Sequence, residues 1–106
     1  HDCFTTTEYM AIDHLGLTPP GQSWQAIADG SIAPGGRCPV NMSGGLIGCG
    51  HPVGATGVRM LFDAARQVSG KAGPCQIEGA TRIQTLNIGG ALATVVSFVV
   101  EAGEAK

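Results

Sequence analysis

The chain has 106 residues, the length of one domain, and its composition excludes a disordered protein, because 43% of the residues are hydrophobic and a further 17 are glycine. Only 13% are charged, with a net charge of −2, which is too little charge to cover a free surface of this size, so we infer a large buried interface. The few lysines and arginines are scattered along the chain, which argues against nucleic acid as a partner. The longest apolar stretch, residues 92–100, is about half as long as a membrane-spanning helix, so no membrane span is predicted.

The first predicted element is a helix over residues 6–15. Thr5 and Glu8 have the spacing of a capping box, apolar residues follow at helical spacing, and Gly16 supplies a stop. Residues 18–40 are rich in proline and glycine and predict a long connection. Connections of this length usually bind a ligand or cover a site.

An amphipathic helix is predicted after a glycine-rich stretch over residues 43–57, and it ends at Gly70. Its charged residues lie on a different face from its apolar residues, which are Val58, Leu61, Phe62, Ala65 and Val68. Two strands follow, over residues 82–85 and 92–100. The second strand is apolar on both faces, and such strands are covered by helices on both sides, so the predicted class is layered α/β.

Chemistry is indicated first by the turn Gly50-His51-Pro52-Val53-Gly54 and the glycine at position 57. Pro52 biases His51 away from the helical region, and the glycines let a ligand approach the backbone. This places His51 at a strand-to-helix junction, a common place for sites in α/β proteins. The alternative is a phosphate-binding loop, although the spacing matches neither common glycine-rich pattern.

A second candidate is Cys3, which follows His1 and immediately precedes the first helix. The positive end of the helix dipole and an adjacent imidazole both favour a thiolate. A purely structural role for Cys3 is an equal alternative. The other cysteines, at positions 38, 49 and 75, form no C-x-x-C pair, so we expect reduced, mostly buried thiols and no metal site.

Taken together, four segments resemble the C-terminal half of thiolases, and the His-Asp-Cys-Phe form resembles the sterol-carrier-protein-2 type. The segments, in chain order, are His1-Asp2-Cys3-Phe4, Asn41-Met42-Ser43-Gly44-Gly45-Leu46, Gly50 to Gly57, and Ile88-Gly89-Gly90-Ala91. The resemblance covers nearly the whole chain. It implies an incomplete thiolase-like domain over residues 1–106, with helices packed on a mixed sheet that keeps the third, fourth and fifth strands of the family's sheet.

The resemblance also implies the function: an acyl-CoA acyltransferase of lipid metabolism that makes or cleaves a carbon–carbon bond through an acyl-cysteine whose nucleophile lies outside this chain. His51 would donate to the thioester oxygen in an oxyanion hole and help activate the nucleophile. Cys3 would be the general acid/base, and His1 would stand where other thiolases have an asparagine that positions a water. Gly50, Gly54, Asn87 and Gly89 would line the substrate pocket.

The partners implied by the resemblance are an acyl-CoA substrate, the missing N-terminal half or a second chain, and copies of the same protein in a homo-oligomer. No tightly bound cofactor is expected beyond the coenzyme A thioester. Two alternatives stay open, a retro-aldol lyase or a non-catalytic acyl-CoA-binding protein of the same fold, and a structural module. Because the chain begins inside a motif we expect a fragment or a processed chain. Residues 104–106 carry no peroxisomal signal, so the default location is the cytoplasm, or the peroxisome or mitochondrion in a eukaryote.

Overall fold

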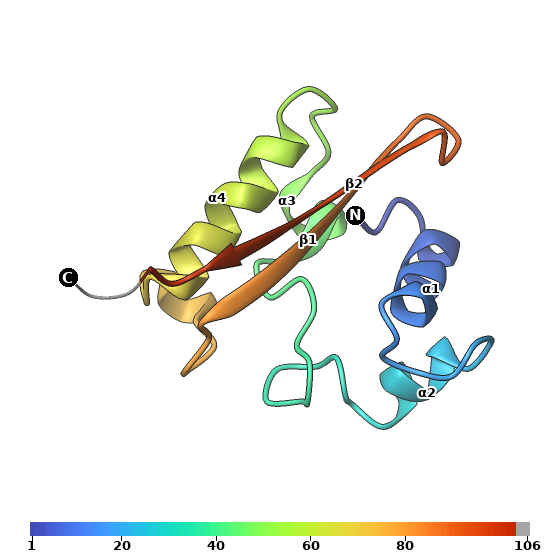
Figure 1. Cartoon of the computed structure of the whole chain (residues 1–106), viewed down its shortest axis with the longest axis horizontal. Coiled ribbons are helices and arrows are strands. Elements are labelled where there is room, and N and C mark those ends of the chain that lie inside the picture. The colour runs from blue at the N-terminus through green and yellow to red at the C-terminus, as the bar shows by residue number, and fades with distance from the viewer. Residues whose placement is uncertain (104–106) are drawn as a thin grey trace. The chain divides into compact units, whose positions relative to one another are not determined.

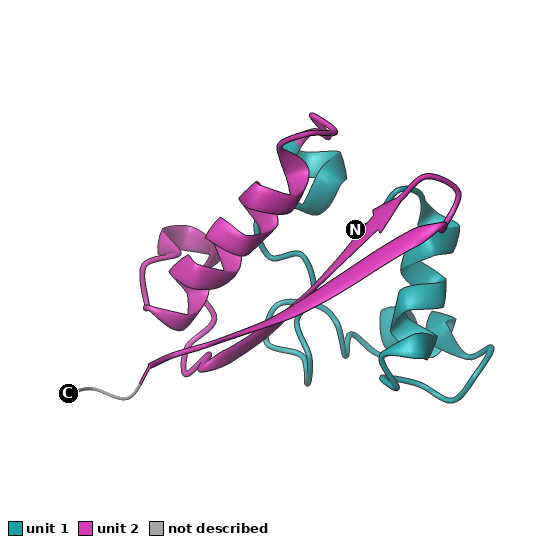
Figure 2. Ribbon diagram, turned by 45° about the horizontal axis from the view of Figure 1, so that its top comes forward, with its two compact units in different colours: residues 1–49 teal, residues 50–106 magenta. Residues whose placement is uncertain are grey.

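A computed structural model gives the architecture of the chain and describes residues 1–103. Four α-helices and a short 3-10 helix precede a pair of strands (Figure 1). The chain divides into two compact units, residues 1–49 and the residues from Gly50 onward (Figure 2). The C-terminal tripeptide on which the predicted location depends lies outside the described residues.

The first unit contains α1 (Thr5–His14), α2 (Ser23–Ala28) and the single turn α3 (Gly45–Cys49). α1 and α2 pack against each other, and Ile12 and Ala26 are buried. Gly16 ends α1 as predicted. It has a φ of +70°, and its N–H donates to the carbonyl of Asp13, while Leu17 donates to the carbonyl of Ile12. These two bonds form a Schellman motif, which satisfies carbonyls that the helix end would otherwise leave unpaired.

The start of α1 differs from the predicted capping box. The N-cap residue is Phe4, which has no capping side chain, so Thr5 is already inside the helix. The hydroxyl of Thr7 donates to the carbonyl of Cys3 at 3.0 Å instead. The capping-box prediction was therefore wrong, and the helix begins one residue earlier than expected.

The connection over residues 18–40 contains α2 and is tied to the end of α1. Asp13 accepts two hydrogen bonds through its carboxylate, from the hydroxyl of Thr18 at 2.8 Å and from the N–H of Gly21 at 2.7 Å. The guanidinium of Arg37 reaches back to the carbonyl of Leu17. These contacts give the start and the end of the connection fixed positions within the first unit.

The second unit contains α4 (Thr56–Val68), the 3-10 helix η1 (Gly73–Cys75), β1 (Arg82–Gly89) and β2 (Thr94–Glu101). The strands form an antiparallel hairpin. β1 continues to Gly89, so the first strand, which was predicted over residues 82–85, was predicted four residues too short. The expected mixed sheet with a third strand was also wrong for the described part of the chain, because a four-residue connection joins only antiparallel strands, whereas a parallel pair needs a crossover of a dozen or more residues.

α4 contacts both strands of the hairpin (Figure 2), but its predicted apolar face is not the face that is buried. The buried residues of α4 are Thr56, Ala64 and Gln67. Val58 is 71% exposed and Phe62 is 60% exposed. At about 100° per residue these two groups lie on opposite sides of the helix. The helix was predicted correctly, but Val58 and Phe62 of its apolar face are left uncovered, while Leu61 and Val68 are half-buried.

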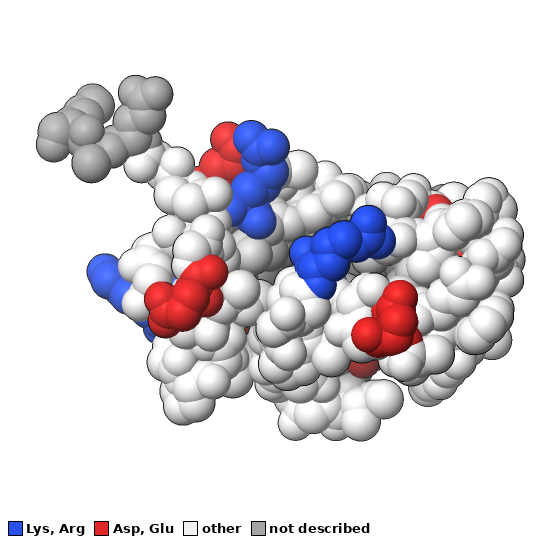
Figure 3. Space-filling view, turned by 90° about the horizontal axis from the view of Figure 1, so that it is seen from below, with Lys and Arg blue, Asp and Glu red and all other residues white. Residues whose placement is uncertain are grey.

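β2 is likewise exposed at nearly every position. Its uncovered apolar residues are Val95, Val96, Phe98 and Val99. The expectation of helices on both sides of this strand is therefore not met within the described chain. Figure 3 shows a face of the molecule on which charged side chains form a few small groups, with uncharged surface over most of the rest. Such uncovered apolar surface is typical of a chain that is covered by a further polypeptide.

Among the helices of residues 1–103, none combines the length and the apolar character that crossing a bilayer requires.

Candidate functional site

The first group of predicted site residues stands at the start of the first unit. His1 and Cys3 are both half-buried and lie just before α1. The carbonyl of Cys3 accepts the hydrogen bond from Thr7, one turn into the helix. This bond fixes the Cys3 backbone relative to the helix start, so the thiol has a defined place at the N-terminal end of α1.

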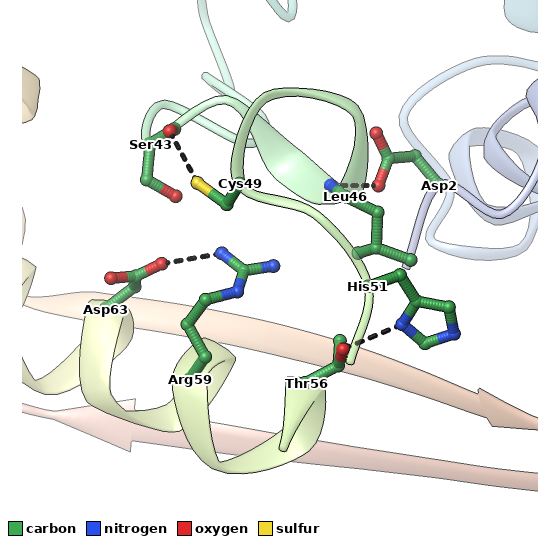
Figure 4. A network of polar contacts seen from close by, with 8 residues as sticks. All are labelled: Asp2, Ser43, Leu46, Cys49, His51, Thr56, Arg59 and Asp63. Carbon is green, nitrogen blue, oxygen red and sulfur yellow. Dashed lines mark hydrogen bonds and ion pairs between the residues drawn. The ribbon is translucent and has the colours of Figure 1, made fainter. Parts of the chain in front are cut away.

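Asp2, between these two residues, anchors the segment to the second motif. Its Oδ1 accepts a hydrogen bond from the N–H of Leu46 at 2.8 Å (Figure 4). A side chain at Gly45 would place its Cβ 2.6 Å from the other carboxylate oxygen, and Gly45 has a φ of +60°. Only glycine tolerates both conditions. Gly45 of the Asn41–Leu46 motif therefore permits the close approach of Asp2.

The remaining cysteines are all free thiols. Cys38 and Cys75 are half-buried, whereas Cys49 is exposed, so the expectation of a buried thiol was wrong for Cys49. The Cys49 thiol donates to the carbonyl of Ser43 at 3.0 Å (Figure 4). This contact links the last residue of α3 to Ser43, which lies two residues before the start of α3.

The second group of predicted residues belongs to the second unit and centres on His51. Gly50 has a φ of +79°, and His51 follows on the turn that leads into α4. The Nδ1 atom of His51 lies 2.7 Å from the hydroxyl oxygen of Thr56, a residue that is only 1% exposed. Figure 4 shows the ring turned with Nδ1 toward that hydroxyl. The imidazole is thus held by the first residue of the helix it precedes.

Asn87 reaches the same end of α4 from β1. Its side-chain oxygen lies 3.4 Å from the position that a Cβ would take at Gly57, the residue after Thr56. That oxygen is buried and has no hydrogen-bond partner among the described residues. His51 and Asn87 therefore both adjoin the first turn of α4. Gly89 ends β1 farther along the same strand, and a Cβ at Gly54 would meet open space.

Arg59 lies one turn into α4 and is more enclosed than a residue on a solvated face. Its Nη1 forms an ion pair with Asp63 at 3.0 Å (Figure 4). Its Nε and Nη2 atoms are buried and unpartnered in the part of the chain that the structure describes. Buried guanidinium groups are costly unless their donors are satisfied. The sequence pattern had placed Arg59 on a different face of the helix from the apolar residues.

One titratable group near Asp2 has a perturbed pKa. Partial burial, together with the negative charge of Asp2, raises the pKa of the Glu8 carboxyl above its ordinary value. A shallow hollow of the second unit is lined by Thr81, Arg82, Glu101 and Ala102 at the open end of the hairpin. None of the predicted site residues lines it.

Comparison with known families decides the relationship. The family model described as "Thiolase C-terminal domain-like" matches residues 1–102. The chain belongs to the thiolase C-terminal domain-like family. The match includes the segments of both units that carry His1, Cys3, His51 and Asn87.

Several thiolase relatives are similar over most of this chain. An acetyl-CoA acetyltransferase of Methanothermobacter thermautotrophicus is 43% identical over 90 residues, which is 85% of this chain and 24% of the relative. Human sterol carrier protein 2 is 41% identical over 98 residues, 92% of this chain and 18% of the relative. The benzoylsuccinyl-CoA thiolase subunit BbsB of Thauera aromatica is 32% identical over 90 residues, 85% of this chain and 23% of the relative. The thiolase-like chain thus spans between about a sixth and a quarter of these curated relatives.

Three residues in these surroundings were missed by sequence reasoning about the site. They are Asp2, Thr56 and Arg59. Asp2 was quoted only as part of a motif, although the glycine pair at 44–45 signalled a close approach to the backbone. Thr56 lies five residues after His51, across a proline turn that brings the two together.

Proposed function

We propose that this chain is the C-terminal catalytic portion of a thiolase that makes or cleaves a carbon–carbon bond in 3-oxoacyl-CoA. The proposal is supported by two features of a chain that is 43% identical to part of an acetyl-CoA acetyltransferase: a thiol before α1, Cys3, and an anchored imidazole before α4, His51. The nucleophilic cysteine lies in a segment outside this chain. The two residues supply proton transfer and oxyanion stabilisation to it.

In the cleavage direction, the nucleophilic sulfur attacks the 3-oxo carbon of the substrate. The bond between the α- and β-carbons breaks, and its electron pair passes into the thioester enolate of the leaving acetyl-CoA. Cys3 then delivers its proton to that α-carbon. The thiol of a second coenzyme A takes the acyl group from the nucleophile, and its proton restores a protein thiol. In the synthetic direction Cys3 acts as the base for the same proton.

His51 stabilises the oxygen that gains negative charge. Its hydrogen bond with Thr56 engages Nδ1, so Nε2 is the nitrogen that faces the thioester oxygen. A donor oriented in advance toward a developing oxyanion is worth about 3 kcal/mol. His1 positions a water in the same hole, and Gly50, Gly54, Asn87 and Gly89 line the pocket for the coenzyme A thioester.

The partner of this chain in the proposed enzyme is the N-terminal half of a thiolase, on the same or a second chain, in a homo-oligomer. The uncovered apolar residues of α4 support this, because Val58 and Phe62 are exposed on the side of the helix that faces away from the hairpin. An apolar helix face of this kind is stabilised only when another element covers it.

The alternative is a retro-aldol lyase or a non-catalytic acyl-CoA-binding protein of the same fold. In both, the fold and the acyl-CoA site are kept, and the nucleophilic cysteine is not used. The deciding residue lies outside this chain, so the two classes are separated by products rather than by the residues described above.

A chimera tests the proposal. The segment of the archaeal acetyl-CoA acetyltransferase that matches this chain is replaced by residues 1–102, and acetoacetyl-CoA is supplied with coenzyme A. Formation of two acetyl-CoA molecules per substrate supports the thiolase assignment. A folded chimera that binds acyl-CoA without any thiolysis would contradict it.

A further inference from the structure

A neutral His51 carries its proton on one of two ring nitrogens, and the contact with Thr56 determines which one. We propose that Thr56 is a positioning residue whose hydroxyl donates to Nδ1 of His51 and thereby fixes the ring in the tautomer with its proton on Nε2. The inference deepens the proposed function, on which its catalytic meaning rests.

The hydroxyl of Thr56 has one proton and two acceptors within reach. The Nδ1 atom of His51 is 2.7 Å away, and the carbonyl oxygen of Pro52 is 3.2 Å away. A short O–H bond to nitrogen is the better hydrogen bond on distance alone. The contact with Pro52 is at the long end of the range for a hydroxyl donor.

The Pro52 carbonyl is, moreover, already shared by two backbone donors. It accepts the N–H of Ala55 at 2.7 Å and the N–H of Thr56 at 3.0 Å. The Thr56 hydroxyl would be a third donor to an oxygen that has two lone pairs. The shorter contact, with Nδ1, is therefore the one that receives the hydroxyl proton. A neutral imidazole that accepts at Nδ1 must carry its proton on Nε2.

The consequence for the proposed chemistry is direct. With the proton on Nε2, His51 presents an N–H donor to a thioester oxygen. With the proton on Nδ1, it would present a lone pair and repel the same oxygen. Thr56 is 1% exposed, so water does not compete for its hydroxyl. Thr56, the first residue of α4, thus determines whether the imidazole of His51 presents a proton or a lone pair to the thioester oxygen.

Nitrogen NMR of the neutral imidazole in the 106-residue chain tests this, because protonated and unprotonated ring nitrogens have widely separated shifts. Three variants are compared with the unaltered chain: Thr56→Val, Thr56→Ser and, as a matched control, Thr85→Val. Thr85 is also a buried threonine of the second unit, and its hydroxyl has no partner among the described residues. Cross-strand amide contacts of the hairpin report whether each variant is folded.

We expect the unaltered chain to show Nε2 protonated and Nδ1 hydrogen-bonded. Thr56→Val should shift the Nδ1 resonance toward that of an unbonded acceptor and introduce the second tautomer, whereas Thr56→Ser and Thr85→Val should keep the original spectrum. A proton on Nδ1 in the unaltered chain would overturn the proposal, and so would an Nδ1 resonance that does not respond to Thr56→Val. If Thr56→Val does not fold, the unaltered chain and Thr56→Ser decide the result. No step of this measurement needs thiolase activity, so it fails or succeeds separately from the proposed function.

Discussion

Replacing Val58 and Phe62 together by serine removes two strongly exposed apolar side chains from the outer face of α4. Both residues lie opposite the residues through which the helix packs on the hairpin. The substitution therefore leaves the residues that α4 buries in place, although it also removes the contact of the Arg66 guanidinium, which lies 5.7 Å from the centroid of the Phe62 ring. It removes the surface that we infer to be covered by another polypeptide.

The magnitude follows from the exposed fractions. Fully burying a valine or phenylalanine side chain is worth about 1.5–3 kcal/mol. Val58 is 71% exposed and Phe62 is 60% exposed, so covering what remains exposed contributes about 2–4 kcal/mol for the pair. That corresponds to a change of about 30- to 700-fold in the dissociation constant of a complex that buries this face once.

Sedimentation equilibrium of the isolated chain measures the effect, because with so few charges the free chain should associate through this face with copies of itself. Val58→Ser combined with Phe62→Ser should weaken that association by the factor above. Ile27→Ser is the control, since Ile27 is an exposed apolar residue on α2 in the other unit. A monodisperse monomer at micromolar concentration, or equal association constants for the double variant and the unaltered chain, would refute the reasoning.

Two further predictions concern the first unit. The raised pKa of Glu8 means that the fold binds this proton more tightly than the unfolded chain does, so the stability of the unit should fall as pH rises from the ordinary value near 4.5 through the raised native pKa. Glu8→Gln should remove that fall in hydrogen-exchange protection of α1, and an unchanged pH profile would contradict the assignment. Gly45→Ala should destabilise the unit by more than about 1 kcal/mol, because its Cβ would lie 2.6 Å from Asp2 and its φ is +60°. Protection of the Leu46 amide measures this, and protection equal to that of Gly48→Ala, a change at a glycine without a positive φ, would show that the Asp2 contact is unimportant.

The sequence was sufficient for the parts of the fold that local rules determine. α1 and α4 were expected from apolar spacing, and Gly16 and Gly70 end them with left-handed backbone. The start of α1 was not predicted correctly, because the Thr7 hydroxyl donates to the Cys3 carbonyl and no side chain caps the helix. Both hydrogen-bonding arrangements lie within one turn of the helix start, and the spacing of residues does not distinguish them.

The orientation of α4 could not be predicted for a different reason. An apolar stripe shows that a helix face is to be covered, but not by which element, and the usual assumption is the nearest sheet. In this chain α4 contacts the hairpin, and the residues that it buries are Thr56, Ala64 and Gln67. The hairpin therefore does not cover the apolar residues Val58 and Phe62, from which the helix was predicted.

The roles of His51 and Cys3 in the candidate site stay predictions, and the sequence reasoning missed the side chains that hydrogen-bond in their surroundings. His51 and Cys3 stood out because glycine, proline and a helix start surround them. Thr56 and Asp2 did not stand out, because hydroxyls and carboxylates near helix starts are common and most of them serve as caps. Their roles depend on distances of 2.7 and 2.8 Å, which spacing along the chain does not reveal.

The most direct test of the account compares Cys3→Ala with Cys75→Ala in the chimera with the archaeal acetyl-CoA acetyltransferase. Both cysteines are half-buried free thiols, one in each unit, and only Cys3 stands in the proposed proton-transfer position. If each catalytic group stabilises the transition state by about 3 kcal/mol, Cys3→Ala should lower the rate of acetoacetyl-CoA thiolysis by about 100-fold, while Cys75→Ala should leave it nearly unchanged. Full activity of the Cys3→Ala chimera would contradict the assignment of this chain as the half that supplies the proton.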